Sequence, residues 1–141
     1  MRFSLSFRPI LAPTEDAAWA RAESIKQRIA ALRAKAGLTT REPVNEGSRR
    51  LLAAAAQGER LDTRLWTGAA ALTGARGNTT SLVGTPEQVA EALVEYYDLG
   101  VTTFLIRGFD PLADNVEYGR SLLPLTRALI ARREAERAAA E

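Results

Sequence analysis

The stretch that decides the fold spans residues 80–106 and reads TSLVGTPEQVAEALVEYYDLGVTTFLI. Its last six residues, 101–106, are almost all apolar or β-branched, which is typical of a parallel strand buried on both faces. Residues 80–83 predict a second, shorter strand. Between these strands the apolar residues recur at the three- and four-residue spacing of a helix. The stretch therefore predicts a strand–helix–strand unit with short connections.

Sequence signals mark both ends of the helix in this unit. Thr85 is placed to cap its amino end, proline follows at the first helical position, and Gln88 completes a capping box. Gly100 follows the last helical turn and acts as a stop signal. The residues expected to form the buried stripe are Val89, Leu93 and Tyr96.

The amino-terminal residues predict another strand, followed by a long amphipathic helix. Residues 3–7 (FSLSF) alternate apolar and polar side chains, and Pro9 ends the pairing capacity of this strand because proline has no backbone donor. Thr14 is an N-cap signal, and two acidic residues follow it where the helix dipole favours negative charge. Apolar residues then recur at helical spacing until Gly37, which can take the positive φ of a helix end.

Two further helices are expected in the middle of the chain. One runs from about residue 45 or 48 to residue 57, before a glycine, and the other covers residues 61–72. Residues 38–44 are expected to form a loop. The glycine-rich residues 74–78 have the composition of a flexible loop.

The carboxyl end of the chain is predicted to be helical. A helix begins near Leu112, and Pro124 is expected to kink or restart it because proline removes a hydrogen bond of the helix. Residues 128–141 are rich in charge and predict a solvated helical tail. We therefore expect an α/β segment over residues 1–127, with three strands and three or four helices, followed by this tail.

The composition excludes several kinds of chemistry. The 141 residues include no cysteine and no histidine, so neither a thiolate nor an imidazole can act as nucleophile, base or metal ligand. A net charge of +2 is spread along the chain, without the basic and aromatic clusters of a nucleic-acid-binding surface. The chain has neither a signal-peptide core nor a run of membrane-spanning length. We expect a cytoplasmic protein that binds no metal, nucleic acid or membrane.

Candidate ligand-binding residues follow the predicted strands, because ligands of parallel α/β folds meet the carboxyl ends of the strands. Arg8 and Arg107 each directly follow an apolar strand and can hold an anionic group through paired hydrogen bonds. The alternative is a structural ion pair, for example with Asp110. Gly84 and Thr85 can offer backbone donors to an anion, although an ordinary capped helix start explains them more simply.

Arg76 lies in the glycine-rich loop, which has the composition of a lid that closes over a substrate. A solvated arginine in a mobile loop is the simpler alternative. The sequence contains no P-loop, dinucleotide-binding fingerprint, nucleophile elbow or pair of glycosidase carboxylates. The catalytic residues are therefore left unassigned.

Several blocks of the sequence, in their order and spacing, resemble the luciferase-like flavin-dependent monooxygenases. Residues 82–90 (LVGTPEQVA), 96–105 (YYDLGVTTFL) and 107–111 (RGFDP) are similar to the last barrel units of that family. Residues 5–10 (LSFRPI) and 14–19 (TEDAAW) resemble an earlier strand and helix of the same barrel. Within the family, the chain is most similar to the alkanesulfonate monooxygenases.

The resemblance implies a partial TIM-like (β/α)8 barrel made of about three late strands with their helices. It also implies a two-component monooxygenase that uses oxygen and reduced FMN, the latter supplied by a separate NAD(P)H-dependent flavin reductase. In the alkanesulfonate branch such an enzyme cleaves a carbon–sulfur bond and releases an aldehyde and sulfite.

The resemblance also bears on single residues. Arg8 falls where the family places a polar or cationic residue, Arg76 lies in the loop that matches the family's mobile loop, and Phe109 stands where some members have tyrosine. Together with the strand-end argument, this gives the candidate substrate-binding residues Arg8, Arg76, Arg107 and Phe109. The candidate cofactor-binding residues are Gly84 and Thr85.

Two interpretations differ in what the chain does by itself. A closed barrel needs eight strands and about 250 residues. The first interpretation is therefore an incomplete enzyme that needs a separate amino-terminal barrel half and binds FMN weakly alone. Its uncovered strand edges are expected to make it a homo-oligomer. The second interpretation is a truncated, non-catalytic remnant or a dimerising module of the same family.

Overall fold

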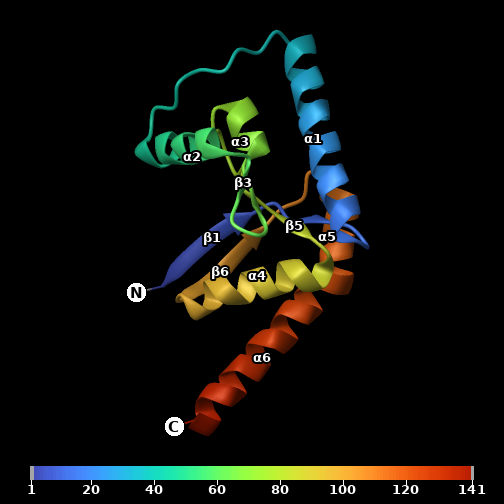
Figure 1. The fold of residues 1–141 in the computed structure, drawn as a ribbon, viewed down its shortest axis with the longest axis vertical. Coiled ribbons are helices and arrows are strands. Elements are labelled where there is room, and N and C mark those ends of the chain that lie inside the picture. Colours follow the sequence, from blue (N-terminus) through green and yellow to red (C-terminus); the bar gives the residue numbers. More distant parts are fainter. Residues whose placement is uncertain (1, 141) are drawn as a thin grey trace.

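The computed structural model describes residues 2–140 as a mixed α/β protein, which confirms the expected class (Figure 1). The strands in the described residues are β1 (Phe3–Phe7), β2 (Ile10–Leu11), β3 (Arg60–Leu61), β4 (Leu65–Trp66), β5 (Ser81–Gly84) and β6 (Val101–Ile106). The helical elements are α1 (Glu15–Lys35), α2 (Glu46–Gln57), α3 (Gly68–Thr73), α4 (Pro86–Asp98), α5 (Pro111–Glu117), the π-helical turn η1 (Tyr118–Leu122) and α6 (Leu123–Ala140).

The strands form two small sheets that meet at residues 3–11. β1 pairs in parallel with β6, and β2 pairs in parallel with β5. A hairpin of β3 and β4 pairs antiparallel with the other edge of β5. Arg8 and Pro9 separate β1 from β2, and the amide of Arg8 still donates to the carbonyl of Thr80 at 2.9 Å. Residues 3–11 therefore lie between β6 and β5.

The hairpin is the main departure from the sequence-based prediction. A helix over residues 61–72 is wrong for most of that range, because Leu65 and Trp66 form β4 and only α3 is helical. β4 occupies one edge of β5, and β6 lies beside β1 instead of beside β5. The consecutive strand order of a β/α barrel is therefore not seen, and residues 2–140 form no closed barrel.

The predicted starts of α1, α2 and α4 are confirmed. The hydroxyl of Thr85 accepts a hydrogen bond from the Gln88 amide at 3.3 Å, and the Gln88 side chain accepts one from the Thr85 amide at 2.9 Å. Thr14 and Asn45 cap α1 and α2 in the same way with their side-chain oxygens. These caps use only residues within one turn, and local sequence was sufficient to predict them.

The carboxyl-terminal helices form one segment whose α-helical hydrogen bonding is interrupted once. The π-helical turn η1 lies just before Pro124, which has no N–H to give to the helix. This confirms an irregularity near Pro124 and places it slightly earlier in the chain. Beyond it α6 is helical to Ala140, and the carboxylate of Asp98 at the end of α4 binds Arg133 and Arg137 at 3.4 and 2.6 Å.

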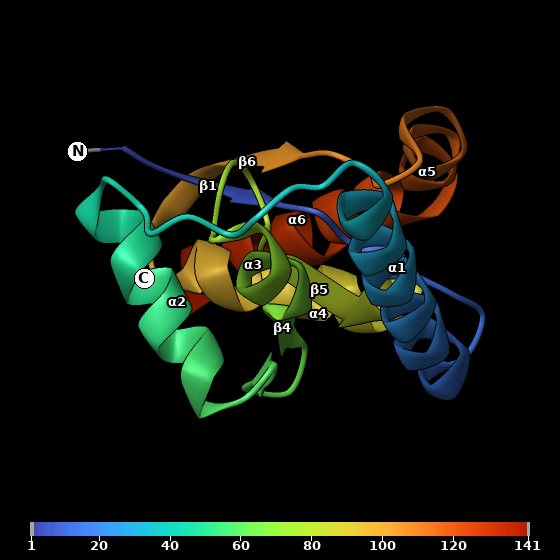
Figure 2. The same cartoon turned by 90° about the horizontal axis from the view of Figure 1, so that it is seen from above.

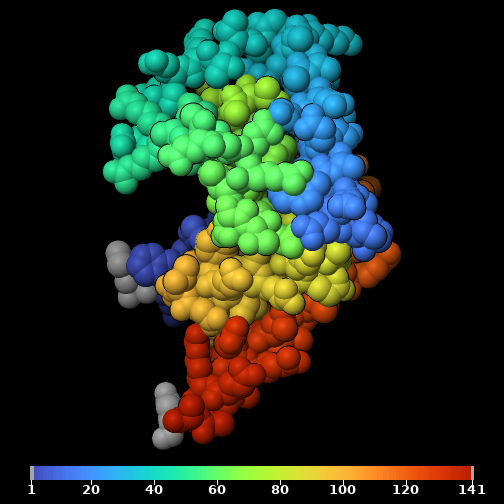
Figure 3. Space-filling model, in the orientation of Figure 1, coloured from blue at the N-terminus to red at the C-terminus, as the bar shows by residue number. Residues whose placement is uncertain are grey.

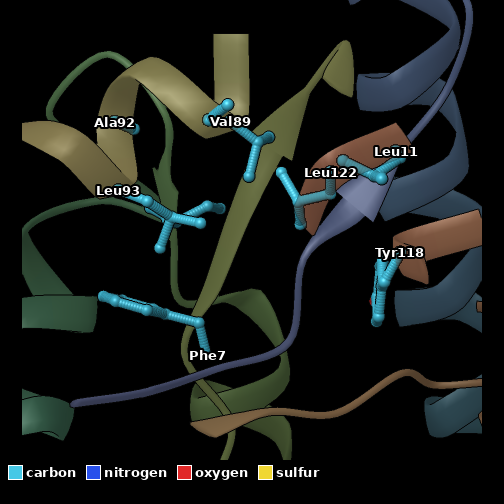
Figure 4. Close-up of a cluster of buried hydrophobic side chains, with 9 residues drawn as sticks. Phe7, Leu11, Val89, Ala92, Leu93, Tyr118 and Leu122 are labelled. Atoms are coloured by element: carbon cyan, nitrogen blue, oxygen red, sulfur yellow. The ribbon is translucent and has the colours of Figure 1, made fainter. Parts of the chain in front are cut away.

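The two faces of the strands differ in composition. One face packs against α4 and α6 and holds the larger apolar core (Figure 4). Its buried members are Phe7, Leu11, Leu82, Val89, Ala90, Ala92, Leu93, Tyr118 and Leu122. The opposite face is apolar only near β2, β4 and β5, where it packs against α1 and α3. The buried members of this second cluster are Ile10, Ala18, Ala22, Ile25, Trp66, Ala69 and Val83.

β6 is more exposed than the sequence predicts. Burial on both faces is wrong: Thr102 and Thr103 are exposed, and Leu105 is 55% exposed. Within residues 2–140, β1 is the one strand that pairs with β6, and Figure 2 shows β6 at the margin of the fold. An apolar run is therefore compatible here with a strand that has an open edge and an open face.

Candidate functional site

The open face of β1 and β6 carries polar side chains and points away from α4. Because side chains alternate along a strand, the residues on this open face are Ser4, Ser6 and Arg8 of one segment and Thr103, Leu105 and Arg107 of the other. The space-filling view shows a hollow in the surface between α2 and β1 (Figure 3). The carboxyl ends of β1 and β6 lie side by side, because the amide of Arg107 donates to the carbonyl of Phe7 at 3.1 Å.

Arg8 is held in one position by backbone acceptors. Its Nε donates to the carbonyl of Asn78 at 2.6 Å, and its Nη1 donates to the carbonyl of Gly108 at 2.7 Å. The guanidinium lies 5.1 Å from the ring centre of Phe109. Burial and the neighbouring charge of Arg107 lower the pKa of Arg8, although an arginine remains a cation at neutral pH. Arg8 is therefore a fixed, partly desolvated cation with Nη2 left over for another acceptor.

Arg107 is the second cation at this point and is exposed. In the described part of the chain, neither Arg8 nor Arg107 forms an ion pair with Asp110, so the structural alternative considered above is not observed. The carboxylate of Asp110 instead caps α5 by accepting from the amide of Ala113 at 3.4 Å. Two neighbouring cations are thus left to attract an anion.

Buried polar atoms without partners lie on the same side of the strands. Thr79 and Ser81 are 7% and 0% exposed, and neither hydroxyl has a hydrogen-bond partner within residues 2–140. The hydroxyl of Ser6 and Nδ2 of Asn78 are also buried without a partner in that range. Unpaired buried polar groups destabilise a protein, so a cluster of them indicates that a polar ligand or water binds there.

The strand register brings these atoms next to Arg8. β2 and β5 pair with Ile10 opposite Val83. Continued towards the amino end, this register places Ser81 opposite Arg8 and Thr79 opposite Ser6. Hydroxyl, amide and guanidinium groups that can all donate hydrogen bonds therefore lie in one strip on this side of the strands, in which the hydroxyls and the amide are buried and Arg8 is half-buried. Such a strip suits a ligand rich in oxygen acceptors.

An ion pair and a tyrosine support the strand ends from behind. Asp114 is 3% exposed, binds Nη2 of Arg21 at 2.5 Å and accepts from the amide of Asp110 at 2.9 Å. The hydroxyl of Tyr118 donates to the carbonyl of Pro9 at 2.5 Å, and burial raises the pKa of Tyr118 above its ordinary value. Tyr118 is therefore a structural donor. Sequence reasoning missed this network, because no local pattern connects α1 to α5.

The other predicted site residues lie elsewhere or have structural partners. Arg76 is exposed and lines a separate hollow of about 390 Å³ beside the start of α2. Gly84 and Thr85 belong to the capping box, which uses the amides of Thr85 and Gln88. A Cβ at Gly84 would lie 2.8 Å from Oε1 of Gln88, which explains the glycine. The structure thus brings together Arg8, Arg107 and Phe109. It favours a structural role for Gly84 and Thr85.

Residues 2–140 offer neither a metal site nor a membrane-spanning helix. No group of three or more acidic side chains in this range is arranged to hold a metal ion. No helix in the same range is both long and apolar enough to span a membrane. The strand-end strip around Arg8 remains the candidate site.

The family model described as luciferase-like monooxygenase matches residues 1–103 of the 141-residue chain. The matched part contains Arg8, the buried hydroxyls and the capped start of α4, whereas Arg107 and Phe109 follow its last residue.

Proposed function

Because the chain belongs to the luciferase-like monooxygenase family, whose members are flavin-dependent, we propose that its strand-end strip serves the oxidation of a substrate with an anionic group. The observation that carries this proposal is the pair of cations at the ends of β1 and β6, next to buried donors without partners. An alkanesulfonate fits this chemistry, because a sulfonate offers three oxygens to several donors at once.

The two arginines would have different tasks. Arg8 is fixed by two carbonyls, so its remaining Nη2 donor would orient the anion at little entropic cost. Arg107 is exposed and would close onto the anion from β6. The ring of Phe109 would help to hold the Arg8 guanidinium in place through a cation–π contact. Arg76, which lies in a different hollow, would contribute only if its loop moved.

The same strip fits the polar edge of a flavin. The buried hydroxyls of Ser6, Thr79 and Ser81 and the amide of Asn78 would hold oxygen and nitrogen atoms of FMN. When bound in its reduced form, FMN supplies the electrons with which oxygen is activated. Tyr118 is committed to Pro9 and would only support the strand ends. No residue of the chain is assigned a proton-transfer role.

The proposal includes two partners. A separate NAD(P)H-dependent flavin reductase would supply reduced FMN. An amino-terminal barrel half would add strands beside β6, whose outer edge lacks a partner within residues 2–140. The alternative of a non-catalytic remnant draws no support from the family match.

Binding of octanesulfonate to the full chain tests the arginine assignment. Arg107→Ala should weaken binding by up to about 1 kcal/mol, the upper range for an ion pair made by an exposed side chain. Isothermal titration calorimetry at low salt would measure the change, with octanol as the uncharged ligand and Arg50→Ala on α2 as the matched control, since Arg50 is 81% exposed. If wild type and Arg107→Ala bind octanesulfonate with equal affinity, Arg107 is a solvated residue that does not contact the anion.

A further inference from the structure

Asp114 on α5 is a buried acidic residue whose two carboxylate oxygens bind different parts of the chain. It is 3% exposed, and acidic side chains are rarely buried unless they have partners. Oδ1 accepts from Nη2 of Arg21 on α1 at 2.5 Å, and Oδ2 accepts from the backbone amide of Asp110 at 2.9 Å. The first bond joins α5 to α1. The second holds the loop that carries Arg107 and Phe109, and anchoring α1 alone would not require it.

Gly108, in the same loop, packs directly against Asp114. Gly108 is buried, and a Cβ at this position would overlap the Cβ of Asp114, so only a residue without a side chain fits there. The carbonyl of this glycine accepts from Nη1 of Arg8 at 2.7 Å. Asp114 therefore contacts the residue whose carbonyl holds the Arg8 guanidinium.

The main chain that follows Arg8 is anchored to the same group of residues. Nη1 of Arg21 donates to the carbonyl of Leu11 at 2.9 Å, so Arg21 binds Asp114 and β2 at the same time. Within residues 2–140, Arg8 and Asp114 form no ion pair with each other. Any influence of Asp114 on the Arg8 side chain therefore passes through the loop at Gly108.

We propose that Asp114 is a positioning residue, which holds the Gly108 carbonyl in place and thereby sets the direction in which Arg8 presents its free Nη2. The donors of a guanidinium lie in one plane, so a shift of one acceptor turns the remaining donors with it. This inference rests on the proposed function, in which the fixed Arg8 binds the anion. A loosened Arg8 would have to be ordered again when the anion binds, and the affinity would fall. The alternative is that Asp114 only stabilises the packing of α1.

The Arg8 side chain offers a test that needs no ligand. Exchange of its Nε–H proton with water, followed by NMR spectroscopy of the full chain, reports how firmly the guanidinium is held. The signal is identified by its absence from Arg8→Lys. Asp114→Ala should accelerate this exchange by roughly 2–10-fold, the factor that corresponds to one net hydrogen bond. Leu93→Ala is the matched control: Leu93 is 1% exposed in the core beneath α4 (Figure 4), so its loss destabilises the fold but should leave the exchange unchanged.

Asp114→Asn covers the case in which Asp114→Ala fails to fold. Asparagine keeps the shape of the side chain and one acceptor oxygen, so it can retain only one of the two bonds to Arg21 and Asp110. Exchange at Arg8 should then lie between that of wild type and that of the alanine variant. An unchanged exchange rate in a folded Asp114 variant would overturn the proposal and leave Asp114 with a structural role. An equal acceleration in Leu93→Ala would also overturn it.

Calorimetric titration with octanesulfonate separates this inference from the proposed function. Asp114→Ala should weaken binding several-fold more than Leu93→Ala does. If wild type does not bind octanesulfonate but the exchange at Arg8 responds to Asp114→Ala, the proposed function fails and the positioning of Arg8 stands. If wild type binds octanesulfonate, and neither the exchange nor the affinity responds to Asp114→Ala, only the positioning role is wrong.

Discussion

The same strands present two faces that serve different ends. Towards α4 and α6, the side chains of β1, β5 and β6 meet apolar partners and are largely excluded from water. On the opposite side, Arg8 bonds to backbone carbonyls, and nearby hydroxyls are buried without partners in the described residues. Neighbouring residues of one strand thus belong to different environments, because alternation sends them to opposite faces.

This difference separates the stability of the fold from its capacity to bind. On a face where every polar group already has a partner, no group remains to bind a ligand. The open face keeps donors and charge available, and in the unliganded protein this lowers stability. Changes on the two faces are therefore expected to have unequal effects on unfolding. Two pairs of substitutions test this, and a third pair tests a contact outside both faces, from the largest effect to the smallest.

Leu122→Ala should have the largest effect. Leu122 is 0% exposed in the core beneath α4, and loss of a buried leucine leaves a cavity that costs about 2–5 kcal/mol of unfolding free energy. Leu105→Ala, on the open face of β6, should change it by less than about 0.5 kcal/mol. Urea unfolding followed by circular dichroism measures both. Similar losses at the two positions would mean that the open face is covered in solution.

Arg8→Ala should have an intermediate effect. It leaves the carbonyls of Asn78 and Gly108 without their donors, and we expect a loss of about 1–3 kcal/mol in unfolding free energy. Arg107→Ala should stay within about 0.5 kcal/mol of wild type, since Arg107 is exposed. The same urea experiment distinguishes them. If Arg107→Ala were the more destabilising, the assignment of Arg8 as the fixed cation would be wrong.

The smallest effect is expected at Glu15, where α1 meets the start of α4. Hydrogen bonds from Arg64 first, and from Gln88 second, hold the pKa of Glu15 below its ordinary value. A lowered pKa in the folded state stabilises the fold above the ordinary pKa, and this contribution is lost as pH falls towards the lowered value. Glu15→Gln should flatten the acid side of the stability–pH curve. Glu87→Gln on the exposed side of α4 is the control, and equal slopes in all three proteins would contradict the assignment.

The sequence correctly predicted the parts of the fold that depend on residues close together in the chain. Thr85 and Gln88 define their capping box within one turn, and the start of α1 at Thr14 follows the same logic. The hairpin that includes Leu65 and Trp66 was missed, because its two-residue strands are too short to show an alternating pattern and β4 also depends on its pairing with β5. The burial of β6 was overestimated for the same reason: it depends on which strands lie beside it.

The residues of the candidate site were likewise predicted only in part. Arg8 and Arg107 were predicted from their positions after apolar strands, and the structure places them together. The hydroxyls of Thr79 and Ser81 give no signal in the sequence, because their role depends on the register between β5 and residues 3–11. The bond that fixes Arg8 to Asn78 spans 70 residues, and no local pattern predicts such a contact.

The π-helical turn η1 has a consequence for how the chain tolerates change. Leu112 and Val116 of α5 face water, whereas Tyr118 and Leu122 of the turn are buried. Deleting one residue here would restore ordinary winding and rotate α6 relative to α5 by about 100°. Either Tyr118 would lose Pro9, or α6 would turn its apolar side away from α4. Surface substitutions along this helix should be acceptable, but its residue count is fixed.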